Sequence, residues 1–316
     1  MRFALSQEQH DFAASIDQLL SGVDTPSVIR AWAAGEHEPG LKVWRDLAEL
    51  GVTALTVPER FDGLGATAVD LVVAFERLGY HGVPGPWVDT AAVLPALLDD
   101  EVLAGTAAGE TIASVAAPPE VPYALDADVA HLRVFVRDDE VTVFSRGHRL
   151  PGVDVARRLF EVKPGDQIGV AHDPARAFDL GVLATAAQLL GAGQWLLDTS
   201  VAYAGQRHQY GRAIGQYQAI KHLLADVATK LELARPLLYG AAVAEHTATR
   251  ARDVSAAKVA AADAAYLAAR TGLQVHGAIG YTSEHALGLW LTKVRALVGA
   301  WGTQAFHRSR VLGALV

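Results

Sequence analysis

The sequence predicts a mainly helical fold with a small central β region. Residues 1 to about 105 carry helical spacing with clear start and stop signals, residues 110–175 change to alternating and β-branched patterns, and the chain is helical again from Phe178 onward. We therefore expect an N-terminal helical domain over residues 1–108, a reduced β domain over 109–176 and a C-terminal four-helix bundle over 177–316.

Local signals place the N-terminal helices. Ser6 is a suitable N-cap with Gln9 three residues later, ahead of an apolar run. The following stretch "LKVWRDLAELGV" predicts a helix that ends at Gly51. The stretch "ATAVDLVVAFERLGY" predicts another strong helix, stopped at Gly79, and "GVPGPW" separates it from a further helix that starts at Asp89.

The central region has the period of strands. "TIASVAA", "HLRVFVRDDEVTVFS" and "RRLFEVKPG" alternate in polarity or carry β-branched runs. The middle segment predicts a hairpin whose turn lies at Asp138-Asp139.

The C-terminal region has the pattern of packed helices. The apolar stretch from Leu180 to Leu197 contains Thr185, Gln188 and Gln194, so we expect a buried helix and no membrane span. A later seam of apolar residues alternates steps of three and four, which is typical of helices that pack lengthwise. Residues 256–269 are nearly all small and allow close helix approach.

Composition excludes several classes of function. The net charge of −8 argues against nucleic acid as a partner, and the absence of cysteine excludes disulfides, thiolate metal sites and cysteine nucleophiles. The histidines show none of the spacings of a metal site, so we expect no metal. The N-terminus lacks the pattern of a signal peptide, and we expect a cytoplasmic protein.

Two stretches carry candidate binding residues. In "RHQYGRAIGQYQAIKHLLAD", Arg207 ends one helix and Gln218 lies at the start of the next; a guanidinium can hold a phosphate and an amide can hold a base edge. An ordinary charged loop is the alternative interpretation. In "QVHGAIGYTSE", Gln274 supplies an amide, Gly277 permits close backbone approach to a ligand, and Glu284 is expected to cap the following helix.

These stretches, in this order, resemble the acyl-CoA dehydrogenase family. "LAELGVTALTVPERFDGLGATAVDLVVAFERLG" is similar to the family's "LaelGl.gl.vPe.yGG.G....d.....EelG", and "RHQYGRAIGQYQAIKHLLADVATKLELAR" to its "R.qFG.pi..fQ.i...LAd....le.aR". "QVHGAIGYTSE" is similar to its "Q.hGg.Gyt.E", and the first helix to its "F.LT.EQ" start. The resemblance covers nearly the whole chain and implies the same three-part fold.

The resemblance implies a chemistry for which this chain lacks the central group. The family uses a glutamate to remove the α-proton of an acyl-CoA thioester, while FAD accepts the β-hydride. Most members place the glutamate in "YEGT" before the last helix, where this chain has Trp301 among Gly299, Ala300 and Gly302. A minority place it on the first bundle helix, at the position that corresponds here to Gly181, followed by Val182. Neither Trp301 nor Gly181 can act as a base.

The resemblance also implies a shared cofactor. Family members bind FAD across two subunits, and Arg207, Gln218, Gln274 and Gly277 match the residues that hold the adenine and pyrophosphate end for a neighbour. The family's "TEP..GSD" and "K.WITN" stretches, which bind the flavin ring and substrate, are missing from residues 110–175.

We therefore expect a subunit of an α2β2 acyl-CoA dehydrogenase that completes the FAD site of a full-length partner. The partner binds most of the acyl-CoA, and a steroid side-chain CoA ester is the expected substrate class. Two alternatives stay open. One is a self-sufficient enzyme that uses another base, Asp179 or Glu284, and the other is a flavin-free scaffold or regulator of the same fold.

Overall fold

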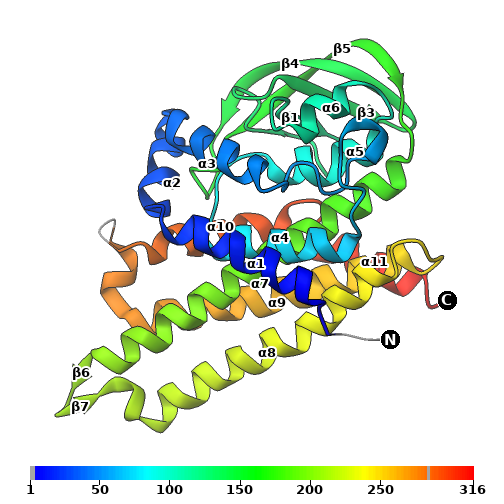
Figure 1. The fold of residues 1–316 in the computed structure, drawn as a ribbon. Coiled ribbons are helices and arrows are strands. Elements are labelled where there is room, and N and C mark those ends of the chain that lie inside the picture. Colours follow the sequence, from blue (N-terminus) through cyan, green and yellow to red (C-terminus); the bar gives the residue numbers. More distant parts are fainter. Residues whose placement is uncertain (1–3, 283–284) are drawn as a thin grey trace.

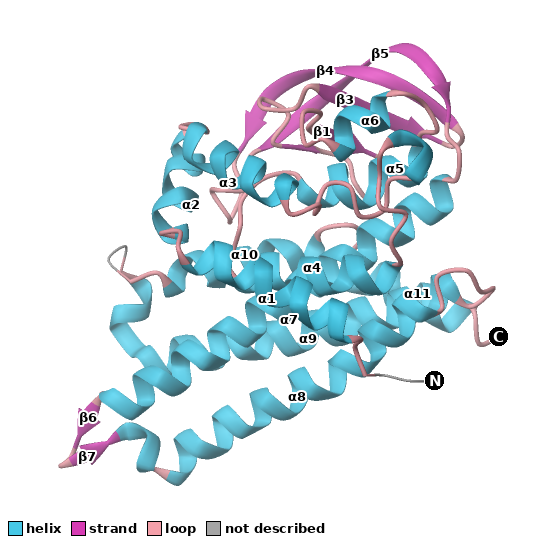
Figure 2. Cartoon of the chain, in the orientation of Figure 1, coloured by secondary structure: helices cyan, strands magenta, loops and turns pink. Residues whose placement is uncertain are grey.

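The chain folds as a β-sheet and a helical bundle joined by N-terminal helices. The computed structural model describes residues 4–282 and 285–316. Figure 1 shows the sheet at the top and helices α7, α8 and α9 at the bottom; helix α4 packs on α7 and α8, and α1 packs on α4. Figure 2 shows that helix dominates the chain and that the long strands are confined to one layer. The mainly helical fold with a small central sheet is thus confirmed.

The N-terminal helices start and stop largely where the local signals predict. The Ser6–Gln9 capping box is formed, because Ser6 Oγ accepts the Gln9 N–H at 3.2 Å and Gln9 Oε1 accepts the Ser6 N–H at 3.0 Å. A π-helical segment over Val88–Val93 replaces the expected helix from Asp89. The helices are α1 Gln7–Ser21, α2 Thr25–Ala34, α3 Glu38–Glu49, α4 Ala68–Tyr80, α5 Leu94–Leu97 and α6 Val102–Ala107.

The prediction that Gly79 stops its helix is wrong. Helix α4 runs through Gly79 to Tyr80, and the chain turns at Gly82, whose φ is +67°. A glycine is required at position 79 for a different reason. A Cβ there would lie 2.2 Å from the carbonyl oxygen of Gln188 on the neighbouring helix α7. The glycine therefore permits close helix packing and does not end the helix.

The sheet has five strands in the order β1-β3-β4-β5-β2. Strand β1 pairs in parallel with β3, and the other pairs are antiparallel. The predicted hairpin is present, with Asp138-Asp139 as its turn and Asp138 at a φ of +52°. The strands are β1 Ala113–Ala116, β2 Ala124–Leu125, β3 Leu132–Arg137, β4 Glu140–Leu150 and β5 Leu159–Val170.

The bundle is built around one long buried helix. Helix α7 contains the apolar stretch predicted to be buried; it is long and apolar enough to cross a membrane, but 89% of its most apolar window is buried inside the protein. Small residues bring the helices together, since a Cβ at Gly193 would lie 3.1 Å from Cα of Ala265 on α9. The elements are α7 Pro174–Gln206, strands β6 His208–Gln209 and β7 Arg212–Ala213, α8 Gln218–Val243, α9 Arg250–His276, α10 Leu287–Gly299 and α11 Gln304–Gly313.

Candidate functional site

Trp301 and Gly181, the residues at the two positions where the resemblance places the family's base, touch each other. Trp301 lies in the loop between α10 and α11, and Gly181 lies on α7. A Cβ at Gly181 would stand 2.6 Å from Cε3 of Trp301, so the indole packs directly on the glycine backbone. The side chain of Phe178 lies beside the indole, with 5.9 Å between ring centroids. The indole of Trp301 therefore fills the space above Gly181.

Buried polar groups hold the loop of Trp301 in place. Lys258, which is fully buried, donates to the carbonyl of Leu297 at 2.8 Å, near the end of α10. His307 Nε2 donates to the Trp301 carbonyl at 2.9 Å, and its Nδ1 faces the Ser255 hydroxyl at 3.1 Å. Burial, with Lys258 nearby, lowers the pKa of His307 to about 4, so the imidazole is neutral near pH 7. The loop is thus fixed by hydrogen bonds to its backbone.

Asp179, considered above as an alternative base, forms ion pairs with two arginines. Its Oδ2 lies 2.8 Å from Nε of Arg250, and its Oδ1 lies 2.5 Å from Nη1 of Arg310. The carboxylate is almost completely buried. Both oxygens are engaged in this ion-pair cluster, so the geometry does not favour Asp179 as a proton acceptor. The other alternative, Glu284, lies outside the described residues.

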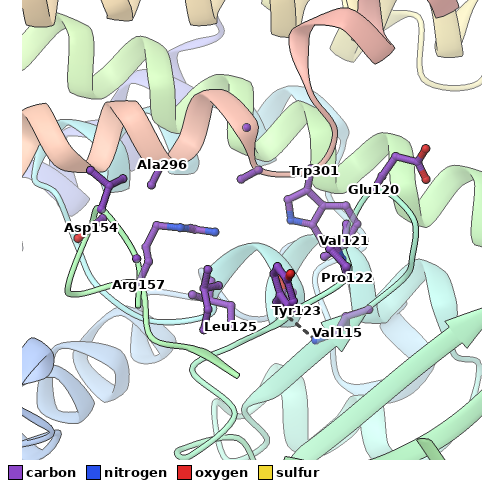
Figure 3. Close-up of a pocket in the computed structure, with 16 residues that line it drawn as sticks. Val115, Glu120, Val121, Pro122, Tyr123, Leu125, Asp154, Arg157, Ala296 and Trp301 are labelled. Atoms are coloured by element: carbon purple, nitrogen blue, oxygen red, sulfur yellow. Dashed lines mark hydrogen bonds between the residues drawn. The ribbon is translucent and has the colours of Figure 1, made fainter. Parts of the chain in front are cut away.

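A cavity of about 230 Å³ lies between the sheet and the bundle, beside Trp301. Figure 3 shows Arg157 and Trp301 on opposite sides of it, with Val121, Pro122 and Leu125 among the apolar side chains of the wall. Asp89 also lines the cavity and accepts the Val115 N–H at 2.9 Å. Its pKa is raised to about 7 by burial, although the hydrogen bond and the nearby Arg157 act in the opposite direction.

The predicted binding residues gather at one end of the bundle. Arg207 caps the end of α7, Gln218 begins α8, and Gln274 lies in the last turn of α9, next to Gly277. Figure 1 shows these three helix ends at the same side of the molecule, near the β6–β7 hairpin. All four residues are exposed. Within the described chain, the side chains of Arg207, Gln218 and Gln274 make no hydrogen bond.

Two family models match most of the chain. Residues 6–100 match the acyl-CoA dehydrogenase N-terminal domain, and residues 173–315 match the acyl-CoA dehydrogenase C-terminal domain. The chain is 32% identical to the acyl-CoA dehydrogenase IpdE2 of Mycolicibacterium smegmatis over 297 residues, covering 92% of this chain and 93% of the relative. The chain belongs to the acyl-CoA dehydrogenase family.

Solved structures of this family share the fold. The ChsE4-ChsE5 complex from Mycobacterium tuberculosis superposes with a TM-score of 0.84 at 20% identity, covering 100% of this chain and 99% of the other. A variant of the Tcur3481-Tcur3483 steroid acyl-CoA dehydrogenase superposes with a TM-score of 0.86 at 20% identity, covering 98% of each chain. Both solved structures therefore support the three-part architecture.

The bundle end and the cavity beside Trp301 differ in how well their residues fit the parts of an FAD molecule. At the bundle end, a Cβ on Gly277 would meet nothing within 4 Å, and its φ of +65° leaves an open backbone beside unpaired amide and guanidinium donors. That donor set fits phosphate and base recognition. At the sheet, a cavity of about 230 Å³ is smaller than ordinary ligand pockets of about 300–1,000 Å³, and Trp301 forms one wall. The space beside Trp301 is therefore small for a flavin ring together with a thioester.

His276, which adjoins Gly277, is not among the residues that the sequence predicts for the site. His276 Nδ1 donates to the carbonyl of Gly272 at 2.7 Å, and the ring stacks on Tyr203 with centroids 4.3 Å apart. Its Nε2 is buried without a partner in the described structure. The motif "QVHGAIGY" marked the position, but only the fold shows that this nitrogen is left as an unpaired acceptor at the edge of the candidate site.

Proposed function

We propose that this chain is the non-catalytic subunit of a heteromeric, FAD-dependent acyl-CoA dehydrogenase of α2β2 organisation. The observation that carries the proposal is the packing of Trp301 on Gly181, which fills both positions where the family places its base. No proton acceptor is available at either position. The full-length partner supplies the glutamate, the flavin-ring site and most of the acyl-CoA site.

The proposed role of this chain is to hold the adenine and pyrophosphate end of the partner's FAD. Arg207 binds a phosphate, the amides of Gln218 and Gln274 bind the adenine and ribose end, and Gly277 allows its backbone to approach. When bound, FAD accepts the hydride in the desaturation of the acyl-CoA thioester. The protein residues bind and orient the cofactor, so their loss acts on flavin retention.

An apolar surface on the bundle supports association with a partner. Leu233 and Leu237 of α8 are 64% and 49% exposed, and they border a cavity of about 430 Å³ between α8, α9 and α11. A groove bordered by exposed leucines is a candidate surface for contact with another protein. The likeness to the ChsE4-ChsE5 complex supports a partner from the same family, and the likeness to the steroid dehydrogenase supports a steroid side-chain CoA ester as the substrate class.

Co-expression tests the proposal. The chain is purified alone and together with a full-length acyl-CoA dehydrogenase encoded beside it, and the ratio of flavin to protein is measured after gel filtration. We expect a colourless chain alone and a yellow, active complex with one FAD for each pair of unlike subunits. A yellow chain that desaturates acyl-CoA without a partner would refute the proposal.

A substitution within the complex tests the role of Arg207. We expect Arg207→Ala to weaken FAD retention roughly ten- to hundredfold, because a charge-assisted hydrogen bond to phosphate is lost. Arg295→Ala, an exposed arginine of α10, is the matched control and should leave the flavin content unchanged. Equal flavin retention in both variants would contradict the assignment.

A further inference from the structure

The cavity beside Trp301 presents two hydrogen-bond donors to an apolar space. Figure 3 shows the guanidinium of Arg157 and the indole nitrogen of Trp301 facing this space from opposite sides. Among the described residues, no ion pair involves Arg157 and no hydrogen bond involves Trp301 Nε1. Both groups only donate, and none of the carboxylates that line the cavity, Asp89, Glu120 and Asp154, makes a hydrogen bond to either of them.

The neighbouring carboxylates do not neutralise Arg157. Asp89 is held by the Val115 N–H, and burial favours its uncharged form. Asp154 Oδ1 accepts the Ala156 N–H at 3.0 Å, while its Oδ2 has no hydrogen-bond partner and lies 4.0 Å from Nζ of Lys293. Glu120 contributes to the rim, and its carboxylate points away from the cavity (Figure 3). Asp126 is a further buried carboxyl close to Arg157, and burial favours its uncharged form as well. Among the described residues, Arg157 makes no ion pair with any of these carboxyls, so its guanidinium remains available to an anion that enters the cavity.

The size and walls of the cavity limit the anion to a small molecule. An apolar cavity of about 150 Å³ accommodates a benzene ring, so a volume of about 230 Å³ leaves room for one ring with a carboxyl group. Val115, Val121, Leu125 and Leu159 supply apolar walls. Two other lining residues, Tyr123 and Val153, are 48% and 55% exposed, so the cavity is accessible from solvent at this side.

We propose that this cavity is a binding site for a small monocarboxylate with a compact apolar body, such as an aromatic carboxylic acid. The carboxylate takes hydrogen bonds from the Arg157 guanidinium and the Trp301 indole N–H, and the apolar body packs on the walls. The ligand joins the loop before β5 to the loop before α11, so its binding stabilises the contact between sheet and bundle. This site does not depend on the heteromeric function proposed above.

Fluorine NMR with 4-fluorobenzoate as the probe tests the site. The protein is used in the form in which it is stable, alone or in its complex, and 4-fluorobenzamide is the uncharged comparison. We expect the benzoate signal to broaden and saturate on titration and the benzamide signal to change little. No broadening of the benzoate signal at millimolar concentrations, or equal affinity for both probes, would overturn the proposal without any variant being needed.

Two variants assign the donors. Arg157→Gln is expected to weaken 4-fluorobenzoate binding roughly ten- to hundredfold, and Trp301→Phe, which keeps the ring and removes the N–H, roughly threefold or more. Arg295→Gln serves as the charge-matched control and should bind as the unmodified protein does. If Arg157→Gln and Arg295→Gln bind the benzoate equally, the carboxylate is not held by Arg157 and the proposal fails.

Discussion

Trp301 combines a strained backbone with an extensively packed side chain. Its φ is +55°, a region that large side chains rarely adopt, yet only 5% of the residue is exposed. The packing on Gly181 and the hydrogen bond from His307 to its carbonyl stabilise this conformation. The strain at Trp301 is therefore compatible with a well-packed loop.

Truncation of this side chain should reveal how much its packing contributes. We expect Trp301→Ala to lower the free energy of unfolding by about 3–5 kcal/mol, the usual cost of removing a buried aromatic side chain. Denaturant titration followed by circular dichroism measures the change. Trp301→Phe should lose only part of that amount because most of the packed ring remains. A loss below about 1 kcal/mol for the alanine variant would show that the loop collapses around the gap.

The titration of Asp89 makes the stability of the folded protein depend on pH, and the sign of this dependence is defined. Burial raises its pKa from 3.8 to about 7 in the folded protein, so the folded state binds more protons than the unfolded state between about pH 4 and pH 7. The contribution of Asp89 to stability therefore falls as pH rises through this window and is constant above it. Asp89→Asn keeps an oxygen for the Val115 N–H but removes the titration.

We expect the stability of Asp89→Asn, relative to the unmodified protein, to increase between pH 5 and pH 7 by on the order of 1–3 kcal/mol and then level off. Denaturation midpoints measured at half-unit steps of pH check this. Asp139→Asn, at the exposed turn between β3 and β4, should follow the unmodified protein throughout. Parallel profiles for the unmodified protein and Asp89→Asn would contradict the assignment.

At the scale of elements, helix α7 and the loop before α11 pack closely because the small Gly181 faces the large Trp301. A Cβ at Gly181 would overlap the indole, so Gly181→Ala should destabilise the protein by about 1–3 kcal/mol. In a Trp301→Ala background the overlap disappears, and the same substitution should become neutral or stabilising, because alanine favours a helix. Denaturant titration of the four proteins in this double-mutant cycle measures a coupling energy, expected to exceed about 1 kcal/mol.

Gly205 supplies the control for that cycle. It lies on the same helix, and a Cβ there would meet nothing within 4 Å. Gly205→Ala should raise stability by up to about 1 kcal/mol in both backgrounds. Additive effects at Gly181 would mean that the two residues do not press on each other.

Local rules predict the elements of this fold better than they predict its contacts. The Ser6–Gln9 capping box and the Asp138-Asp139 turn depend on neighbours within a few residues, and both are formed. Gly79 was misread as a stop signal because its purpose is a contact with Gln188, more than a hundred residues away. Helical periodicity contains no information on such a contact.

The cavity is a second feature that depends on contacts between residues far apart in the sequence. Asp89, Arg157 and Trp301 come from a π-helical segment and two loops, and no motif links them. The sequence could show that Trp301 stands where a base is expected. Only the fold shows that Gly181 lies directly beneath it and that a donor-rich cavity lies at its side.

At the scale of the whole molecule, restoring a carboxylate should not restore catalysis. Trp301→Glu would place an acid in the loop, but the remaining cavity adjoins Arg157 and the apolar walls of the sheet, and under the proposal the flavin-ring site belongs to the partner. We expect the variant, purified without a partner and supplied with FAD and acyl-CoA, to reduce an artificial electron acceptor no faster than the unmodified chain. The complex with the full-length partner is the positive control. Turnover by the lone variant above that background would mean that this chain contains a complete active site, and the division of the FAD site between two subunits would have to be abandoned.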